Sequence, residues 1–487
     1  MESSYEKLKK MDFYKYFKDI SNIPRGSGNE EAVHNYIINF AKEHGLEYKA
    51  DNNFNVIIYK DGVGTGKDKD AVMLQGHLDM VCEKIAASNH DFMKDPIEIY
   101  EKDGYLTAKE TTLGADNGIA VAYSLAVLSN NLENCPPIEA LFTTNEEVGM
   151  EGMKAVDNSW IYSNKMINLD SEEEGMLTTS CAGGSRFILS RKLNYTANKE
   201  NNTGYHIEIS GLLGGHSGND INKGRGNSII LLGRLLFELK ERFNIRISSL
   251  GGGSKMNAIP IFSFADIWFS GEDKKEIEDY IHTFLNSIKL EYSKFDPEIN
   301  VSLSPVKIEN KPNVMDKNTL EDILDLIFFM PNGLILNSPY EENTTLSSSN
   351  MGVLMINNDM IEIQGLARSN VNSKIYNIIG IIQRICNRTN FEYTKGSSYP
   401  AWEPNENSEF QKIAKAVYKE QYGKDMVSTS MHGGLECALM IEKKPDMDMI
   451  AIGPTILEVH TVHERADITS LVDTWEYILA LLQELAK

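Results

Sequence analysis

Three apolar runs of this chain each lead to an imidazole or a carboxylate, and this succession is the feature that most constrains the fold. The runs and the polar residues that follow them are 71–74 with His77 and Asp79, 138–144 with Glu146 and Glu147, and 165–169 with Asp170. Short apolar runs are typical of buried strands, and helical patterns alternate with them. The alternation predicts an α/β domain whose largely parallel sheet is covered by helices on both faces.

The pattern changes near residue 184 and changes back near residue 399. Between these points, strand-like runs mix with longer helical patterns, which predicts an α+β insertion with an antiparallel sheet. At 487 residues, the chain is also too long for one ordinary core. We therefore expect the first part of one domain at 1–184, an inserted domain at 185–398, and the second part of the first domain at 399–487.

The charge balance and the cysteines narrow the class of protein. The 48 Lys and Arg residues against 70 Asp and Glu residues give a net charge of −22, which argues against a nucleic-acid or anionic-membrane partner. The five cysteines are scattered without a Cys-x-x-Cys pair, as expected in a reducing compartment. Residues 1–20 lack the apolar segment of a secretory signal, and the longest apolar run, 118–128, is short for a membrane span. These features predict a cytoplasmic protein.

The polar residues at the strand ends have the chemistry of a metal site. In chain order they are His77 and Asp79, Asp116, Glu146 and Glu147, Asp170, and either His460 or His463. Carboxylates and imidazoles suit zinc or manganese, and one bridging carboxylate allows two ions. Two ions can hold a hydroxide and polarise a carbonyl, which suits amide hydrolysis. In the Glu146–Glu147 pair, one carboxylate can bind metal while the other acts as general base.

Each of these motifs alone has an ordinary structural explanation. A Glu-Glu pair is usually a solvated turn. Asp116-Asn117-Gly118 is typical of a turn before a capped helix, and residues 170–174 of an acidic surface loop. His-x-Asp by itself is a weak signal. The hypothesis of a metal site depends on their conjunction, because all of these groups fall at the ends of predicted strands or at a helix start.

The same motifs resemble those of a known family. They are His77-Leu78-Asp79, Leu113-Gly114-Ala115-Asp116-Asn117-Gly118, Asn145-Glu146-Glu147-Val148-Gly149, Asn168-Leu169-Asp170-Ser171-Glu172 and His432-Gly433-Gly434-Leu435-Glu436-Cys437. Together they are similar to the aminoacyl-histidine (Xaa-His) dipeptidases, which belong to the carnosinase and aminoacylase group of dizinc peptidases. The resemblance runs from about residue 24 to the last predicted helix. It implies an αβα sandwich catalytic domain interrupted by a lid domain.

The resemblance implies a role for each candidate residue. Asp116 corresponds to the ligand that bridges two Zn²⁺ ions, with Mn²⁺ or Co²⁺ as alternatives. His77 and Asp170 correspond to ligands of one ion, and Glu147 with a late histidine to ligands of the other. Glu146 corresponds to the general base, and Asp79 to the carboxylate that orients His77.

The identity of the late histidine is open. The family pattern is His-Ser-Pro-x-Glu, and Glu464 sets a register in which His460 is the ligand. This chain has Thr461-Val462-His463 in place of Ser-Pro-x. His463 therefore remains an alternative, and the register favours His460.

The resemblance also assigns residues of the lid domain. His216 corresponds to the donor that stabilises the oxyanion. Asn257 and Arg368 correspond to substrate contacts, and the amides of Gly433 and Gly434, at a predicted helix start, could receive a substrate carboxylate. The family further implies a cis peptide at Asp116–Asn117 and a homodimer formed through the lid.

The function predicted from the sequence is a cytosolic dizinc peptidase that hydrolyses dipeptides, of Xaa-His type with broad specificity. A tripeptidase, a carboxypeptidase or an N-acyl amino acid deacylase on the same metal centre is the alternative. A third possibility is a peptide-binding or scaffold protein without activity, but such a protein would be expected to lose the base or a ligand, and this chain keeps them all.

Overall fold

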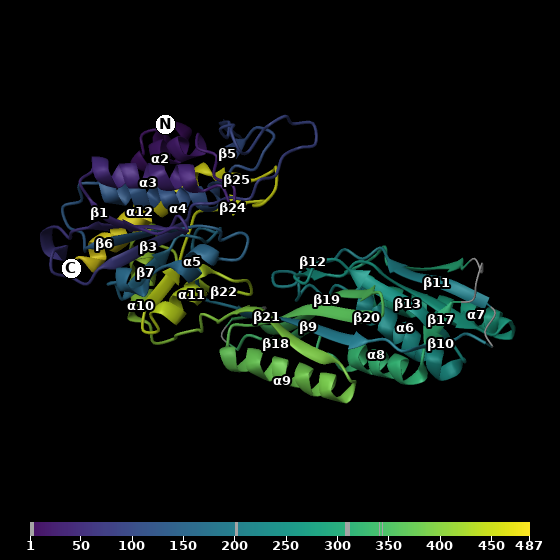
Figure 1. Cartoon of the computed structure of the whole chain (residues 1–487). Helices are drawn as coiled ribbons and strands as arrows, with labels where there is room; N and C mark the ends of the chain where they lie inside the picture. The colour runs from purple at the N-terminus through teal and green to yellow at the C-terminus, as the bar shows by residue number, and fades with distance from the viewer. Residues whose placement is uncertain (1–3, 200–202, 307–311, 340, 343) are drawn as a thin grey trace. The chain divides into compact units, whose positions relative to one another are not determined.

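The computed structural model describes residues 4–199, 203–306, 312–339, 341–342 and 344–487. The chain forms two compact units, which are labelled by element in Figure 1. Unit 1 comprises Met1–Ser180, Pro404–Ser430 and Leu435–Lys487, and unit 2 comprises Cys181–Glu403 and Met431–Gly434. The predicted fold class, α/β with an inserted antiparallel sheet, is confirmed. The domain boundaries after residues 184 and 398 stay predictions.

Unit 1 is built on a mixed sheet with the strand order β1-β2-β6-β3-β7-β23-β8-β22. These strands are β1 Glu47–Ala50, β2 Val56–Lys60, β3 Val72–His77, β6 Ile138–Thr143, β7 Lys165–Asn168, β8 Met176–Cys181, β22 Val427–Met431 and β23 Asp448–Ala451. The central strand β3 runs parallel to β6 and β7, with His77 opposite Thr143 and Gln75 opposite Asn168. The carboxyl ends of these three strands therefore meet at one edge, where open α/β sheets hold ligands.

Helices cover both faces of this sheet (Figure 1). They are α1 Ser4–Leu8, α2 Asp12–Ser21, α3 Glu31–Glu43, α4 Ala115–Ser129, α5 Glu151–Ala155, α10 Glu409–Tyr422, α11 Glu436–Lys443 and α12 Ile468–Leu485. α4 is buried on almost all sides and packs closely on β3. A Cβ at Gly76 would lie 2.5 Å from Asn117 Oδ1 and 2.6 Å from the Cβ of Ala120, so glycine permits this approach.

A small sheet in the order β24-β25-β5-β4 carries the second imidazole of the site. Its strands are β4 Ile99–Lys102, β5 Tyr105–Ala108, β24 Ile456–Leu457 and β25 Arg465–Asp467. The loop between β24 and β25 contains His460, whose backbone is left-handed with φ of 62°. Such a conformation is unusual for a residue other than glycine and occurs often at functional sites.

Unit 2 is an antiparallel sheet in the order β16-β11-β15-β13-β19-β20-β9-β21, with β18 paired to β19. Its strands are β9 Gly183–Lys192, β11 Thr203–Ser210, β13 Arg246–Gly253, β15 Ser263–Phe269, β16 Asn300–Pro305, β18 Gly333–Asn337, β19 Thr345–Asn357, β20 Met360–Ser369 and β21 Glu392–Tyr399. The helices α6 Ser228–Arg242, α7 Lys274–Tyr292, α8 Lys317–Phe329 and α9 Asn372–Arg388 contribute to one hydrophobic core with it. A short hairpin of β12 Gly215–His216 and β14 Ala258–Ile259 carries His216.

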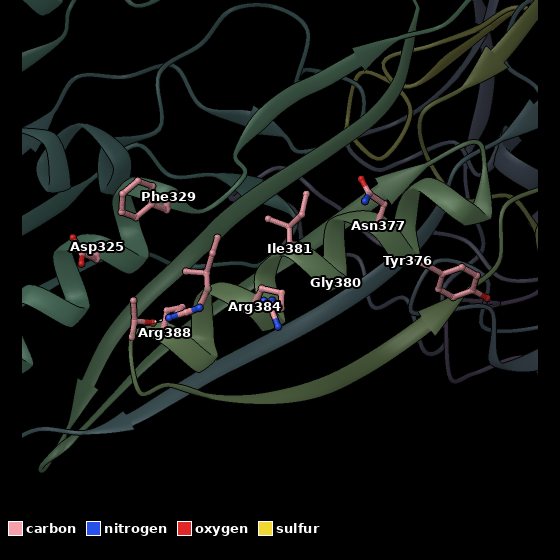
Figure 2. A pocket seen from close by; sticks show the side chains of 10 residues that line it. Asp325, Phe329, Tyr376, Asn377, Gly380, Ile381, Arg384 and Arg388 are labelled. Carbon is pink, nitrogen blue, oxygen red and sulfur yellow. Dashed lines mark hydrogen bonds between the residues drawn. The ribbon is translucent and has the colours of Figure 1, made fainter.

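A groove of about 650 Å³ lies along α8 and α9 in unit 2 (Figure 2). Its lining mixes apolar side chains with cations, including Phe329, Tyr376, Ile381, Arg384 and Arg388. It offers no imidazole for metal binding or acid–base chemistry. Within the described residues, no helix combines the length and the apolar character needed to cross a membrane.

Candidate metal centre

The sheet edge of unit 1 brings the sequence-predicted ligands together. Three overlapping groups have ligand atoms within 4.8 Å of one another: first His77 with Asp116 and Asp170, second Asp116 with Glu147 and His460, and third His77 with Glu146 and Glu147. The side chains come from the ends of β3, β6 and β7, the first turn of α4 and the β24–β25 loop. Residues far apart in the sequence thus form one cluster.

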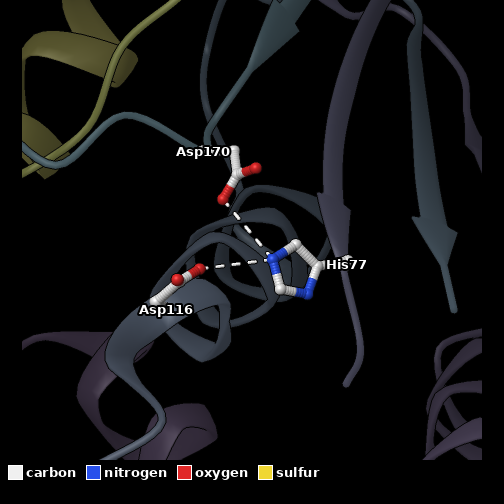
Figure 3. A group of neighbouring side chains, drawn as sticks. All are labelled: His77, Asp116 and Asp170. Atoms are coloured by element: carbon white, nitrogen blue, oxygen red, sulfur yellow. Dashed lines mark hydrogen bonds and ion pairs between the residues drawn. The ribbon is translucent and has the colours of Figure 1, made fainter. Parts of the chain in front are cut away.

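The first group centres on the buried imidazole of His77 (Figure 3). Its Nε2 lies 3.2 Å from Asp116 Oδ1 and 3.5 Å from Asp170 Oδ1. Its Nδ1 lies 3.1 Å from the carbonyl oxygen of Asp79, which can only accept, so Nδ1 carries the proton. In the neutral ring, the Nε2 lone pair therefore points at two carboxylates and requires a cation or a second proton between them.

The pKa of His77 reflects this arrangement. Burial lowers the pKa of His77, but the charges and hydrogen bonds of Asp170 and Asp116 raise it by more than burial lowers it. The net pKa therefore lies well above the usual value. The Asp79 carboxylate is held in turn by Ser27 Oγ at 2.7 Å and the Glu146 N–H at 3.1 Å. This support fixes the ring that presents Nε2.

The second group uses the other oxygen of Asp116. His460 Nε2 lies 3.0 Å from Asp116 Oδ2 and 3.0 Å from Glu147 Oε1. Hydrogen bonds to these two carboxylates raise the pKa of His460 to about 11. Asp116 thus faces one imidazole with each oxygen, which is the geometry a bridging ligand needs. His463 is in none of the three groups found among the described residues.

Glu146 lies beside the ligands in the third group with His77 and Glu147. Loss of solvation is the main cause that raises the pKa of Glu146 well above its usual value. The residue follows Asn145, whose backbone is left-handed with φ of 52°. This turn lies directly between the end of β6 and the two adjacent carboxylates.

Two supporting residues were not predicted from the sequence. The first is Glu464, which in the sequence served only to align the chain with the family's His-Ser-Pro-x-Glu pattern. It is buried and accepts hydrogen bonds from the backbone N–H groups of residues 113–116 at 2.8 to 3.2 Å. Asn117 accepts the His77 N–H at 3.2 Å and donates to Leu169 O at 3.0 Å. The peptide bond that joins Asp116 to Asn117 is cis, as the family implies.

The donor set fits divalent metal ions with nitrogen and oxygen ligands. Four carboxylates and two imidazoles converge, and no thiol belongs to the groups among the described residues. Zinc accepts such ligands at about 2.0–2.2 Å, and manganese and cobalt accept the same types. Two ions would take His77 with Asp170 and His460 with Glu147, and Asp116 would be shared between them.

The predicted lid residues lie in unit 2. His216 Nδ1 accepts hydrogen bonds from the backbone N–H groups of Gly218 and Asn219, both at 3.3 Å. Arg368 donates to the Tyr399 hydroxyl at 2.8 Å and lies 3.5 Å from His216 Nε2. Its Nε is buried and makes no hydrogen bond within the described part of the chain.

The remaining lid predictions lie nearby in the same unit. Asn257 is exposed, and its carbonyl accepts the Ser217 N–H next to His216 at 2.8 Å. Gly433 and Gly434 belong to the Met431–Gly434 segment of unit 2. A Cβ at Gly218 would lie 2.4 Å from the carbonyl oxygen of His432, so this segment touches the turn after His216.

His432 is a further residue for which no role was predicted from the sequence. Its ring is buried between Ser348 Oγ, 2.7 Å from Nε2, and Asn370 Oδ1, 3.3 Å from Nδ1. Burial, followed by the charge of Arg368, lowers the pKa of His432 to about 3. The neutral ring therefore donates from Nδ1 to Asn370 and accepts the Ser348 hydroxyl at Nε2.

Comparisons with known proteins agree with this geometry. The chain matches Peptidase family M20/M25/M40 over residues 73–484. It is 32% identical over 483 residues to the cytosol non-specific dipeptidase of Escherichia coli K12, and the match covers 99% of each chain. The aminoacylhistidine dipeptidase of Vibrio alginolyticus matches with a TM-score of 0.89 and 32% identity, covering 98% of this chain and 97% of that one.

More distant structures share the fold alone. A tripeptidase of Staphylococcus aureus matches with a TM-score of 0.56 and 15% identity over 98% of each chain. The resemblance to aminoacyl-histidine dipeptidases is thus confirmed, and the protein is a peptidase. The chain belongs to Peptidase family M20/M25/M40.

Proposed function

We propose that the protein is a dizinc dipeptidase of Xaa-His type with broad specificity. One observation carries the proposal: the two oxygens of Asp116 face Nε2 of two different histidines at 3.2 and 3.0 Å. A shared carboxylate between two ligand groups is what a two-metal site requires. The similarity to two dipeptidases over nearly the whole chain supports the choice of substrate class.

The protein groups divide the chemistry between them. When bound, two zinc ions would polarise the scissile carbonyl and make water more acidic. Glu146 would take a proton from the attacking water and pass it to the leaving amine. Asp79 would keep the proton of His77 on Nδ1 and so leave Nε2 for metal.

Unit 2 supplies groups suited to negative charge. His216, whose Nδ1 accepts from the backbone, would donate from Nε2 to the oxyanion that develops during attack. The buried Arg368, whose Nε makes no bond to a described residue, suits the carboxylate of a dipeptide. Asn257 and the amides of Gly433 and Gly434 are further candidates for substrate contacts.

Release of amino acids tests the function directly. The purified chain is loaded with zinc and offered Gly-His, β-Ala-His, Leu-Leu and an N-acetyl amino acid, with and without a chelator. A dipeptidase cleaves the dipeptides and stops when the metal is removed. Cleavage of the N-acetyl amino acid alone would instead support a deacylase, and no cleavage of any compound would support a scaffold protein.

A matched pair of histidines tests the last ligand. His460→Ala is expected to lose about one zinc equivalent and nearly all activity, because His460, unlike His463, forms a ligand group with Asp116 and Glu147. His463→Ala, three residues away on the same loop, is expected to retain both. Elemental analysis of the two variants decides between them, and the reverse result would assign His463 as the ligand.

We also propose that the chain forms a homodimer through unit 2. Strand β18 exposes Leu334, Ile335 and Leu336 by 41%, 41% and 40%, and the groove along α8 and α9 adds further apolar side chains (Figure 2). Contiguous exposed apolar surface is typical of interfaces. Leu336→Glu should shift the mass measured by light scattering from dimer to monomer. Leu290→Glu, at an exposed leucine of α7, is the control.

We place the enzyme in the cytoplasm. The support is the negative charge with scattered cysteines and the similarity to a cytosolic relative. Cell fractionation followed by immunodetection tests this placement. Recovery outside the cytosolic fraction would contradict it.

A further inference from the structure

A buried carboxylate lies beneath the metal centre and outside its ligand set. Glu436, at the start of α11, is completely buried in unit 1. Its Oε2 accepts hydrogen bonds from Gln75 Nε2 on β3 and, at 2.6 Å, from the Thr143 hydroxyl on β6. One carboxylate thus joins two of the strands that carry the metal site.

The third strand joins through a relay of amides. Asn168 Nδ2 on β7 donates to Gln75 Oε1 at 2.6 Å, and Asn168 Oδ1 accepts the backbone N–H of Asp170 at 3.3 Å. Hydrogen bonds therefore run without a break from Glu436 through Gln75 and Asn168 to a proposed ligand. All side chains of the relay are fully buried.

The positions of these residues along the strands repeat. Gln75 is two residues before His77 on β3, and Asn168 is two residues before Asp170 on β7. Thr143 is opposite His77 in the sheet, and its carbonyl accepts the Leu78 N–H at 2.7 Å. The network thus forms a polar layer directly below the ligand layer, where an error of strand register would displace the ligands.

The burial of this carboxyl group requires an explanation, because loss of solvation raises its pKa to about 7. A buried carboxylate costs several kcal/mol unless it is compensated. Glu436 Oε1 makes no hydrogen bond within the described part of the chain, so apolar packing of α11 would be the more stable arrangement. A role in holding the three strand ends explains why a carboxyl acceptor occupies this position.

We propose that Glu436 is a positioning residue that holds β3, β6 and β7 in register beneath the ligands and thereby sets the zinc affinity of the site. This inference rests on the proposed metal centre. Residues that support ligands in this way typically change metal affinity by 10- to 100-fold when replaced.

Glu139 provides a matched control. It is a second buried glutamate on β6, at the opposite end of the strand from the ligands. It accepts hydrogen bonds from the Tyr162 N–H at 2.9 Å and the Ser163 hydroxyl at 2.7 Å. Replacing it removes a buried carboxylate from the same sheet without touching the relay to Asp170.

The experiment compares the zinc affinities of Glu436→Ala, Glu436→Gln, Glu139→Ala and Glu139→Gln by competition with a coloured chelator, alongside the thermal midpoint of each metal-free chain. We expect both pairs to lose thermal stability. The zinc affinity should fall 10- to 100-fold in Glu436→Ala, less in Glu436→Gln, and remain within about twofold of wild type in the Glu139 variants. If Glu436→Ala does not fold, Glu436→Gln carries the comparison, because its amide oxygen can still accept from Gln75 and Thr143.

Two outcomes would overturn the inference, and they differ in what else they affect. If the wild-type chain binds two zinc ions and the Glu436 variants bind them equally tightly, Glu436 has no positioning role and the proposed function stands. If the wild-type chain binds no zinc, the metal centre and the positioning role both fail. A selective fall in the Glu436 variants supports both.

Discussion

The two units place histidines in opposite electrostatic surroundings. In unit 1, carboxylates surround His77 and His460 and raise the pKa of each. In unit 2, His432 is buried near Arg368 and His216, and its pKa falls to about 3. The same side chain therefore marks two kinds of site. Unit 1 collects negative charge that a metal cation would neutralise, and unit 2 collects donors and a buried cation that suit an anion.

This difference assigns separate tasks to the two polar clusters. Acidic groups that repel one another are stable together only when cations or protons lie between them. A buried arginine beside a neutral histidine is equally incomplete until a negative group arrives. In the proposed function, a dipeptide would supply that group as a carboxylate, and its scissile carbonyl would develop another negative charge during hydrolysis.

The strongest test of the comparison removes the shared carboxylate of unit 1. If the centre holds two ions as proposed, Asp116→Ala should lose zinc from both positions, and activity should fall by roughly 10⁴-fold or more because both ions would polarise the substrate. Zinc content by elemental analysis and kcat/KM with Gly-His measure the effect. Asp68→Ala, at an exposed carboxylate of unit 1, should match wild type. Two retained zinc ions in Asp116→Ala would refute a bridging role.

A smaller effect separates chemistry from metal binding. Glu146→Gln should retain both zinc ions and lower kcat by about 10²- to 10⁴-fold, the usual contribution of a general base. The comparison of zinc content with kcat shows whether the two properties separate. Hydrolysis at the wild-type rate would assign the base to another residue.

The positive cluster of unit 2 should affect binding more than turnover. Arg368→Ala should raise KM for free dipeptides about 10- to 100-fold, corresponding to the roughly 1.5–3 kcal/mol of a charged hydrogen bond. A dipeptide amide, which lacks the carboxylate, should be affected much less. Arg186→Ala, at an exposed arginine of β9, is the control. Equal losses with both substrates would contradict the assignment of Arg368 to the carboxylate.

The smallest effect follows from the pKa of His432. Its pKa is about 3 in the folded chain and near 6.5 when unfolded, so the unfolded chain binds the proton more tightly. This contribution to stability is complete above pH 6.5 and is lost as the pH falls towards 3. At pH 5 the loss reaches about 2 kcal/mol. Wild type should therefore lose more stability between pH 7 and 5 than His432→Gln, measured by urea unfolding, and equal losses would show that His432 is protonated in the folded chain.

The sequence predicts the parts of this molecule that depend on local pattern. The apolar runs before His77, Glu146 and Asp170 are strands because their length and composition suit a buried sheet. Their polar ends converge because parallel strands share one edge. The fold class and the family follow from these features and are confirmed.

The parts that could not be predicted depend on contacts between distant residues. The hydrogen bond between Gln75 and Glu436 joins positions 361 residues apart, and no periodic pattern of the sequence predicts it. The segment from Met431 to Gly434 continues directly from β22 of unit 1, yet it belongs to unit 2. The structural role of Glu464 is not visible in the sequence, because its hydrogen bonds to residues 113–116 form only when the loop is folded.

The β24–β25 loop also sets the order in which the centre can be assembled. His460 contacts the side chain of Asp116, and Glu464 accepts a hydrogen bond from the backbone N–H of Asp116. Along the chain, 344 residues separate His460 from Asp116. A nascent chain therefore carries His77, Asp116 and Asp170 long before it carries the loop. The proposed group of Asp116, Glu147 and His460 cannot form before this loop has been synthesised.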